Sequence, residues 1–478
     1  MGNTFLQGHY APVSEEVTRH DLDVTGTIPD HLDGRYLRNG PNPIGELDPD
    51  TYNWFMGDGM VHGVRLRDGR AEWYRNRWVR GPRAAALLGE PPPRARRRSG
   101  MEIIGANTNI IGHAGKLVAL VEAGNANYEL TGDLGTAGPC DFDGTVRGGF
   151  TAHPKHDPAT GELHAVSYHF GMGGRVRYDV IGADGRAVRS EDIDVGGSPM
   201  MHDFSLTANH VVLYDLPVTF DAAQAAELAV PWPLRTPVRL LLSALIGRVR
   251  VPDPLTAWLR RGVRAAGPYP YCWNPHRPAR VGVLRRNGTG GVRWFDIPPC
   301  YVFHTANAYD DGDTIVLDLV RHPKVFDVDR TGPAEGDPTL ERWRIDLRTE
   351  VVTQDRLCDR PQEFPRIDER RTGLRHRFGY VVQPDEGALL KHDLHSAGTR
   401  VRRFGAGRVP GEFVFEPRHP GAAEDDGVLM GFVYDAATDR SDLMLLDAET
   451  LDTVAAVHLP QRVPAGFHGN WVPTEPEL

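Results

Sequence analysis

Short apolar runs separated by turn residues recur along the whole chain, and this pattern most constrains the fold. Examples rich in Val, Leu and Tyr are KLVALVEAG at 116–124, HVVLYDLPV at 210–218 and GVLMGFVYD at 427–435. The 53 glycines and 38 prolines supply many turns, and little sequence between the runs has the period of a surface helix. The pattern predicts an all-β fold, with no break that divides residues 1–478 into separate domains.

Composition excludes several classes of protein. The net charge of −10 argues against a general nucleic-acid binder. The chain has four cysteines and no CxxC pair, and so few cysteines in 478 residues are typical of a protein in a reducing compartment. No secretory signal or stretch of about 18 apolar residues is visible, so we expect a cytoplasmic protein that does not span a bilayer. The four cysteines are Cys140, Cys272, Cys300 and Cys358.

Residues 221–262 interrupt the strand pattern and look helical. Leucines cluster at 240–242 and at Leu245, and arginines such as Arg239 and Arg248 flank them. An apolar patch rimmed by arginine suits a helix that lies on a membrane surface, here through residues 234–250 at the inner face. A helical excursion packed on the domain explains the same residues equally well, so both interpretations stay open.

Four histidines lie among small or apolar residues, and turn or strand sequence follows the first three closely. Spacings of 49, 102 and 164 residues separate His153, His202, His304 and His468. These values approximate one, two and three steps of about 50, a period typical of propeller blades. The innermost strand of each blade lines the central axis, where such residues converge. The pattern favours a metal site, although hydrogen-bonded core histidines remain an alternative.

The residue types of the candidate ligands limit which metal ion could bind. Imidazole suits iron, copper, nickel or zinc. Zinc with four histidines makes a closed structural site, whereas six-coordinate ferrous iron would keep two positions open. Metal-bound imidazoles need an acceptor for their second nitrogen, and glutamates in apolar strands are candidates for that role, unless they are only turn or edge residues. These glutamates are Glu122, Glu363 and Glu412.

Several motifs together resemble the carotenoid cleavage oxygenase family. They fall in the family's order and include GRYLRNGPNP at 34–43, WFMGDGMVHGVRL at 54–66, NTNII at 107–111, TAHPKHDPATGELHAVSY at 151–168, MMHDFSLTANHVVLYDLPV at 200–218, FHTANAYDDGD at 303–313, EFPRID at 363–368 and GFHGNWVP at 466–473. The resemblance implies a seven-bladed β-propeller with a helical and loop cap over an axial Fe(2+).

The same resemblance assigns roles to residues. It gives iron ligation to His153, His202, His304 and His468. It pairs Glu122 with His202, Glu363 with His304 and Glu412 with His468, and it places the methyl group of Thr108 beside one open iron position.

The reaction that the resemblance implies joins O2 to a lipophilic alkene. A carbon–carbon double bond is cleaved, and two carbonyl products take one oxygen atom each. An apocarotenoid substrate is expected; a stilbenoid is the alternative, disfavoured because 122–133 contains Tyr128 but no lysine. A non-enzymatic scaffold is the third interpretation. Candidate lining residues are Phe55, Phe150, Tyr301, Phe303 and Phe467.

Overall fold

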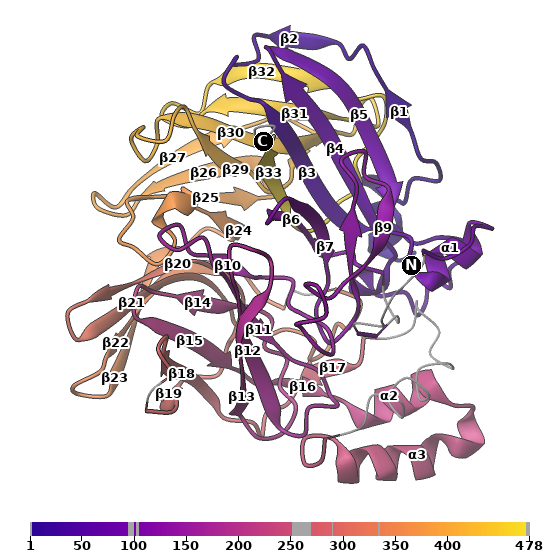
Figure 1. The fold of residues 1–478 in the computed structure, drawn as a ribbon, viewed down its shortest axis with the longest axis vertical. Helices are drawn as coiled ribbons and strands as arrows, with labels where there is room; N and C mark the ends of the chain where they lie inside the picture. The colour runs from indigo at the N-terminus through magenta and orange to yellow at the C-terminus, as the bar shows by residue number, and fades with distance from the viewer. Residues whose placement is uncertain are drawn as a thin grey trace.

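Seven β-sheets arranged around one axis form a seven-bladed β-propeller, as the sequence predicted (Figure 1). The computed structural model describes residues 2–93, 100–101, 105–250, 269–288, 290–332 and 335–474. Neighbouring strands within every blade are antiparallel, and short turns join most of them, which suits a chain rich in glycine and proline.

Blades 1 to 4 are built from the N-terminal part of the chain and the last strand. Blade 1 has the order β1 (Thr18–Arg19), β5 (Arg70–Trp78), β4 (Gly59–Arg67), β3 (Gly34–Pro41) and β33 (Gly469–Pro473). Blade 2 contains β6 (Asn109–His113), β7 (Lys116–Leu120), β8 (Asn127–Leu130) and β9 (Thr136–Cys140). Blade 3 contains β10 (Lys155–His156), β11 (Leu163–Ser167), β12 (Arg175–Ile181) and β13 (Ala187–Asp194). Blade 4 contains β14 (Phe204–Leu206), β15 (His210–Asp215), β18 (Ala279–Arg285) and β19 (Arg293–Ile297).

Blades 5 to 7 follow in chain order. Blade 5 contains β20 (Tyr301–Asp311), β21 (Thr314–His322), β22 (Thr339–Asp346) and β23 (Val351–Cys358). Blade 6 contains β24 (Glu363–Arg366), β25 (Phe378–Gln383), β26 (Ala388–Asp393) and β27 (Gly398–Arg403). Blade 7 contains β2 (Val24–Gly26), β32 (Thr453–His458), β31 (Arg440–Asp447) and β30 (Gly427–Asp435), which pairs with both β28 (Arg408–Pro410) and β29 (Val414–Pro417).

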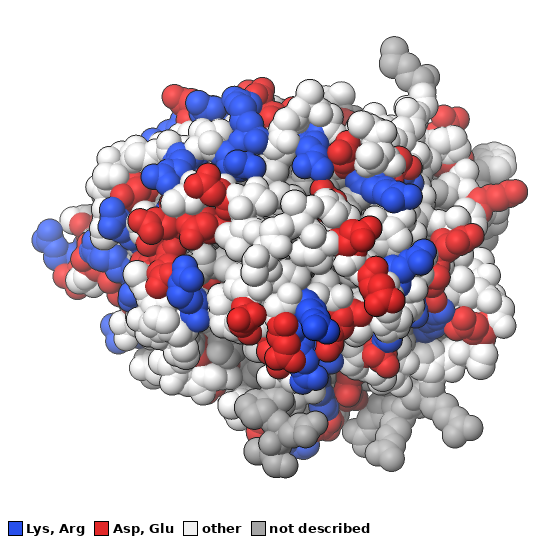
Figure 2. All heavy atoms as spheres, turned by 90° about the horizontal axis from the view of Figure 1, so that it is seen from above, with Lys and Arg blue, Asp and Glu red and all other residues white. Residues whose placement is uncertain are grey.

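Burial along each blade follows the sequence pattern. The middle strand β30 is a continuous apolar run and is buried over eight of its nine residues, because both of its faces pack on neighbouring blades. The outer strand β23 is rich in polar residues and is mostly exposed. On the face seen in Figure 2, acidic and basic side chains are intermixed.

Both ends of the chain close the ring. The C-terminal strand β33 pairs with β3 of blade 1, with Arg38 opposite Gly469. The N-terminal strand β2 pairs with β32 of blade 7. The amide of Asn39 donates to the carbonyl of His468 at 2.9 Å, so the closure itself fixes the position of that histidine.

One step of the histidine spacing was misread. The 102 residues between His202 and His304 span a single blade, not two, since β14 and β20 begin neighbouring blades. The extra length is an insertion between β15 and β18. It holds the small sheet of β16 (Val218–Phe220) and β17 (Tyr271–Trp273) and the helices α2 (Ala222–Ala229) and α3 (Trp232–Leu245).

The predicted helical region is confirmed where it is described. Asp221 caps α2 by accepting from the amides of Ala223 and Gln224, and α3 starts after Pro231. Both helices lie together outside the blades (Figure 1). Residues 251–262 of the predicted segment lie outside the described residues. No helix in the described ranges has the length and apolar character needed to cross a membrane.

Short helices complete the described structure. One α-helix, α1 (Pro82–Leu87), follows β5. The 3-10 turns are η1 (Thr4–Leu6), η2 (Gly8–Tyr10), η3 (Trp54–Met56) and η4 (Glu369–Arg371).

The closing seam gives the first prediction. Leu37 on β3 is fully buried at this seam and packs with Val61, Ile110 and the partly buried Val472 of β33. Replacing Leu37 with Ala should lower the free energy of unfolding by about 2–5 kcal/mol, because the substitution leaves a cavity in the core where the ring closes. Urea unfolding followed by tryptophan fluorescence measures this loss. Val188→Ala, at a side chain 63% exposed, is the control and should change stability by less than about 0.5 kcal/mol.

Candidate metal centre

Four histidines from the starts of innermost strands meet on the propeller axis. His153 and His202 lie two residues before β10 and β14, His468 immediately precedes β33, and His304 is the fourth residue of β20. The innermost strands contact one another around the ring, as β14 does with β20 and β29 does with β33. The chain therefore delivers four imidazoles from blades 1, 3, 4 and 5 to one place.

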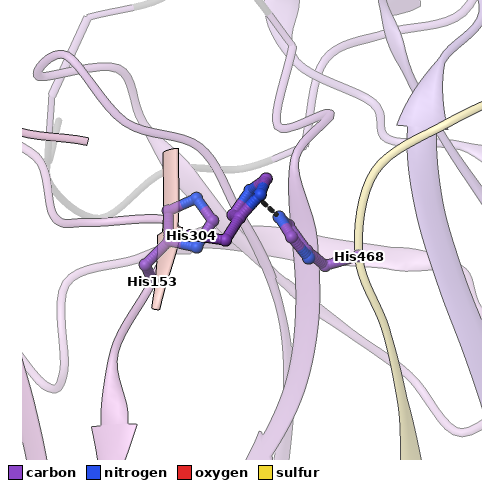
Figure 3. A group of neighbouring side chains, drawn as sticks. All are labelled: His153, His304 and His468. Carbon is purple, nitrogen blue, oxygen red and sulfur yellow. Dashed lines mark hydrogen bonds between the residues drawn. The ribbon is translucent and has the colours of Figure 1, made fainter. Parts of the chain in front are cut away.

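The imidazoles are close enough to share an ion. Ring centroids of His153 lie 4.3, 5.3 and 4.7 Å from those of His202, His304 and His468 respectively. The Nε2 atoms of His304 and His468 are 3.0 Å apart (Figure 3). One nitrogen from each of His153, His304 and His468 lies within 4.8 Å of the other two. One ligand atom from each of His153, His202 and Glu122 forms a second group with the same spacing.

A glutamate lies beside the outer nitrogen of three of the histidines, in the pairing that the sequence resemblance implies. Glu363 Oε2 accepts from Nδ1 of His304 at 2.7 Å, and Glu412 Oε1 accepts from Nδ1 of His468 at 3.0 Å. Glu122 Oε2 lies 2.7 Å from Nδ1 of His202. The glutamates come from the starts of the innermost strands of blades 6 and 7 and from the residues after β7.

These contacts leave lone pairs aimed at the axis. In a neutral imidazole only one nitrogen carries a proton, and the carboxylates place that proton on Nδ1 of His304 and His468. Their Nε2 atoms lie 3.0 Å apart, so a proton on one of them makes a hydrogen bond, whereas two unprotonated Nε2 atoms would offer two lone pairs to a cation. Nε2 of His153 is also buried without a hydrogen-bond partner. These donors fit a divalent transition metal bound by imidazole.

The surroundings shift the protonation of the histidines in opposite directions. Burial, followed by the neighbouring imidazoles, holds the pKa of His153 well below its usual value, and burial lowers the pKa of His468 as well. Burial also acts to lower the pKa of His304, but the Glu363 carboxylate outweighs it and raises that pKa above its usual value. Burial opposes ionisation of Glu412, but Arg366 and His468 outweigh it and lower its pKa to about 2. Ionised carboxylates and uncharged imidazoles form the state that a metal ion requires.

Thr108 occupies the corresponding place in blade 2, just before β6. Its carbonyl accepts from the amide of His468 at 3.0 Å, and its hydroxyl donates to Oδ1 of Asn107 at 2.9 Å. The residue is buried beside the centre. Every blade thus places a predicted site residue at or beside the start of its innermost strand; in blade order these are His468, Thr108, His153, His202, His304, Glu363 and Glu412.

Aromatic residues cover one side of the centre. Phe55 lies with its ring centroid 5.4 Å from Phe467 and 6.2 Å from Phe303, which meets Tyr301 at 4.7 Å. Phe303 also packs edge-on against His202 at 5.1 Å. Four of the five predicted lining aromatics are therefore grouped beside the histidines.

Phe150 does not belong to this group, and its prediction as a lining residue was wrong. Its ring packs on Phe142 at 4.8 Å within the core of blades 2 and 3, with Leu163. Tyr128 is likewise buried in a separate core with Val121. The prediction assumed that a residue close to His153 in the sequence would also lie close to it in space. This fails because the chain turns between Phe150 and the axis.

The opposite side of the centre is polar. A cavity of about 290 Å³ reaches His153, His304 and His468 and is lined by residues that follow them in the chain. Within it Lys155 Nζ pairs with Asp203 Oδ1 at 2.8 Å. Aromatic residues directly precede His304 and His468, whereas polar residues such as Lys155, Asp203 and Asn470 line the cavity, so the centre has two different surroundings.

Sequence reasoning missed several neighbours of the glutamates. The ring of Phe364 stacks on that of His304 with the centroids 5.2 Å apart, and the Phe364 backbone has φ +56°. Arg366 lies 3.6 Å from Glu412. His322 contacts Glu363 at 2.7 Å. Phe364 and Arg366 follow Glu363 in the EFPR segment, which could have directed attention to them. His322 has no comparable signal, since it arrives through strand pairing opposite Tyr301.

A propeller with four axial histidines and carboxylates behind three of them defines a class of metal-dependent protein, and the comparisons with known proteins agree. The RPE65 family model, described as retinal pigment epithelial membrane protein, matches residues 10–473. The chain belongs to the carotenoid cleavage oxygenase family and is an enzyme of that class.

Individual relatives are similar over nearly the full length. The carotenoid cleavage oxygenase of Mycobacterium tuberculosis H37Rv is 55% identical over 99% of this chain and 98% of its own. A variant of the Synechocystis apocarotenoid oxygenase superposes with a TM-score of 0.80 at 25% identity, covering 98% of each chain. The lignostilbene dioxygenase of Pseudomonas brassicacearum gives a TM-score of 0.82 at 26% identity and the same coverage.

The carboxylate contacts generate a second prediction. Glu363→Ala should weaken binding of a divalent metal by about 10- to 100-fold, because Nδ1 of His304 loses its acceptor. Competition against a chelator under anaerobic conditions measures the dissociation constant. Glu341→Ala removes a buried carboxylate, which accepts from Trp343 Nε1 at 2.8 Å in blade 5, and should leave metal affinity unchanged. Equal losses in both variants would contradict a specific role for Glu363.

Proposed function

We propose that this chain is a non-haem iron(II) dioxygenase that cleaves a carbon–carbon double bond of a carotenoid or apocarotenoid with O2. One observation carries the proposal: imidazoles from four blades gather on the axis, and a carboxylate lies beside the outer nitrogen of three of them. His153, His202, His304 and His468 would hold the ion.

Iron suits this donor set better than zinc. Four neutral histidines without a thiolate would close a tetrahedral zinc site, whereas ferrous iron retains two further positions. Bound iron supplies the electronic coupling that lets O2 react with an alkene. The overall change balances without a reductant, since one C=C bond and one O2 give two C=O groups.

The chain's own contribution is to hold and orient. Carboxylates lock the imidazole rings, so the ion would keep one geometry through the reaction. The rings of Phe55, Phe303 and Phe467 offer flat apolar surfaces beside the histidines, which suit a planar conjugated chain and exclude water. Placing one double bond next to the metal is the source of bond selectivity.

A carotenoid-type substrate is favoured over a stilbenoid. The relative at 55% identity is named a carotenoid cleavage oxygenase, whereas the lignostilbene dioxygenase is 26% identical. The segment 122–133 offers no lysine to a phenol, and Tyr128 is buried away from the aromatic group. Lignostilbene-type cleavage remains the second candidate because that structure superposes equally well.

The surface of α3 supports contact with a membrane from the cytoplasmic side. Trp232, Leu234, Leu240 and Leu241 are exposed by 79, 53, 61 and 54%. Exposed Arg235 and Arg239 on the same helix would meet anionic lipid head groups. Such contact would let a lipophilic substrate pass directly from the bilayer into the enzyme.

The activity prediction uses apocarotenals and hydroxystilbenes as a panel. The iron-loaded enzyme should convert an apocarotenal to two carbonyl products, each carrying one label after reaction under ¹⁸O2, as read by mass spectrometry. His304→Ala should abolish turnover while the fold persists. His113→Ala should retain turnover. His113 is a buried histidine at the end of β6 away from Thr108, and its Nε2 contacts the Gly182 carbonyl. Cleavage of hydroxystilbenes alone would favour the second candidate, and absence of metal in the anaerobically purified chain would favour a scaffold.

The membrane prediction concerns two leucines. The double change Leu240→Ser and Leu241→Ser should reduce cosedimentation with anionic phosphatidylglycerol liposomes, because apolar area on α3 is lost. Val328→Ser with Val351→Ser removes comparable exposed apolar residues elsewhere, at 88 and 51% exposure, and should leave binding intact. Liposome binding that is equal in both double variants would exclude α3 as the contact surface.

A further inference from the structure

His322 contacts the centre indirectly, through the carboxylate of Glu363. It is the last residue of β21 and pairs in register with Tyr301 on β20, three residues before His304. Its side chain is buried, and Nε2 lies 2.7 Å from Oε1 of Glu363. The other oxygen, Oε2, accepts from Nδ1 of His304 at 2.7 Å and from the amide of Phe364. One carboxylate thus joins two imidazoles on different strands.

We infer that His322 is a positioning residue that fixes the Glu363 carboxylate and, through it, the ring of His304. This inference rests on the proposed role of His304 as a metal ligand. Because His322 secures Oε1, the carboxylate cannot rotate about its terminal bond without losing that hydrogen bond. Only Oε2 then remains for His304, which sets the direction in which its Nε2 lone pair points.

The surroundings of His322 argue against a role in packing alone. Its Nδ1 is buried without a hydrogen-bond partner. Among the residues that the structure describes, the polar contact of this ring is the one to Glu363, and a leucine or phenylalanine would fill the space without burying an unsatisfied nitrogen. Phe303 packs edge-on against the His322 ring at 5.1 Å and against His202 at the same distance, so the ring is held within the site.

The other two glutamates are secured differently, which makes the His322 contact specific to His304. Glu412 receives the Gly469 amide at 2.9 Å on Oε2 and has Arg366 nearby. Glu122 instead has buried phenols in its neighbourhood, and burial followed by this carboxylate raises the pKa of Tyr168 and of Tyr271. A change at His322 should therefore alter the position of one candidate ligand, His304, and leave the carboxylates of Glu122 and Glu412 in place.

A pair of amide substitutions tests the inference in the full-length protein. His322→Gln places an N–H donor where Nε2 lies, whereas His322→Asn places it where Nδ1 lies, so the two variants share polarity but differ in reach. His322→Leu removes the donor. Co²⁺ is the probe, with its dissociation constant measured by chelator competition and its ligand field by electron paramagnetic resonance.

The Gln variant should keep the wild-type Co²⁺ affinity and spectrum. The Asn and Leu variants should bind about 10-fold more weakly, at the lower end of the effect typical of outer partners, with an altered spectrum. In the iron-loaded enzyme kcat should fall in the same two variants, while KM stays unchanged. His113→Leu, at a buried histidine away from the centre, is the control and should resemble wild type.

Equal affinities and spectra for Gln and Asn would overturn the inference, whether or not the Leu variant folds. A wild-type chain that binds no Co²⁺ would instead overturn the proposed function, and the positioning role with it. These two failures are distinguishable because the first leaves metal binding by the wild-type protein intact.

Discussion

The closure of the ring is the constraint on which the centre depends. A propeller axis can collect residues from distant parts of a chain only if the last blade meets the first, and here β33 meets β3 while β2 meets β32. The same closure places His468, ten residues from the end of the sequence, 3.0 Å from His304. Stability of the fold and assembly of the four histidines are therefore one physical event, since four blades contribute one imidazole each.

Burying three carboxylates near four imidazoles has an electrostatic cost that the local contacts offset. An isolated ionised carboxylate is unfavourable in an apolar interior. Glu363 avoids that state by accepting from two imidazoles and an amide, and Glu412 by accepting from His468 and Gly469 beside Arg366. A divalent cation would add charge of the opposite sign at the point where the inner lone pairs converge. The carboxylates and the gathered imidazoles thus suit a positive charge on the axis.

Much of this could be predicted from the sequence, because a repeated architecture leaves a repeated spacing. Strand runs and turns predicted the all-β class, and the spacing of about 50 residues singled out four histidines that the fold brings together. The step from His202 to His304 was misread because an insertion doubled one blade's length, which spacing alone cannot distinguish from two blades. Phe150 and His322 show the other limit. Whether a side chain faces the axis or the gap between blades depends on strand register and turns, and contacts through pairing, such as Tyr301 opposite His322, leave no local pattern.

The two sides of the centre follow from the direction of the innermost strands. Each candidate ligand lies at or near a strand start, and residues that follow it in the chain line the axial cavity. Phe303 on β20 and Phe467 on the loop before β33 directly precede their histidines, while the axial strands carry Lys155, Asn307 and Asn470. An ion on the axis would therefore face an aromatic surface on one side and a polar cavity on the other. A conjugated hydrocarbon fits only the first of these surroundings, which orients the proposed substrate without any charged contact.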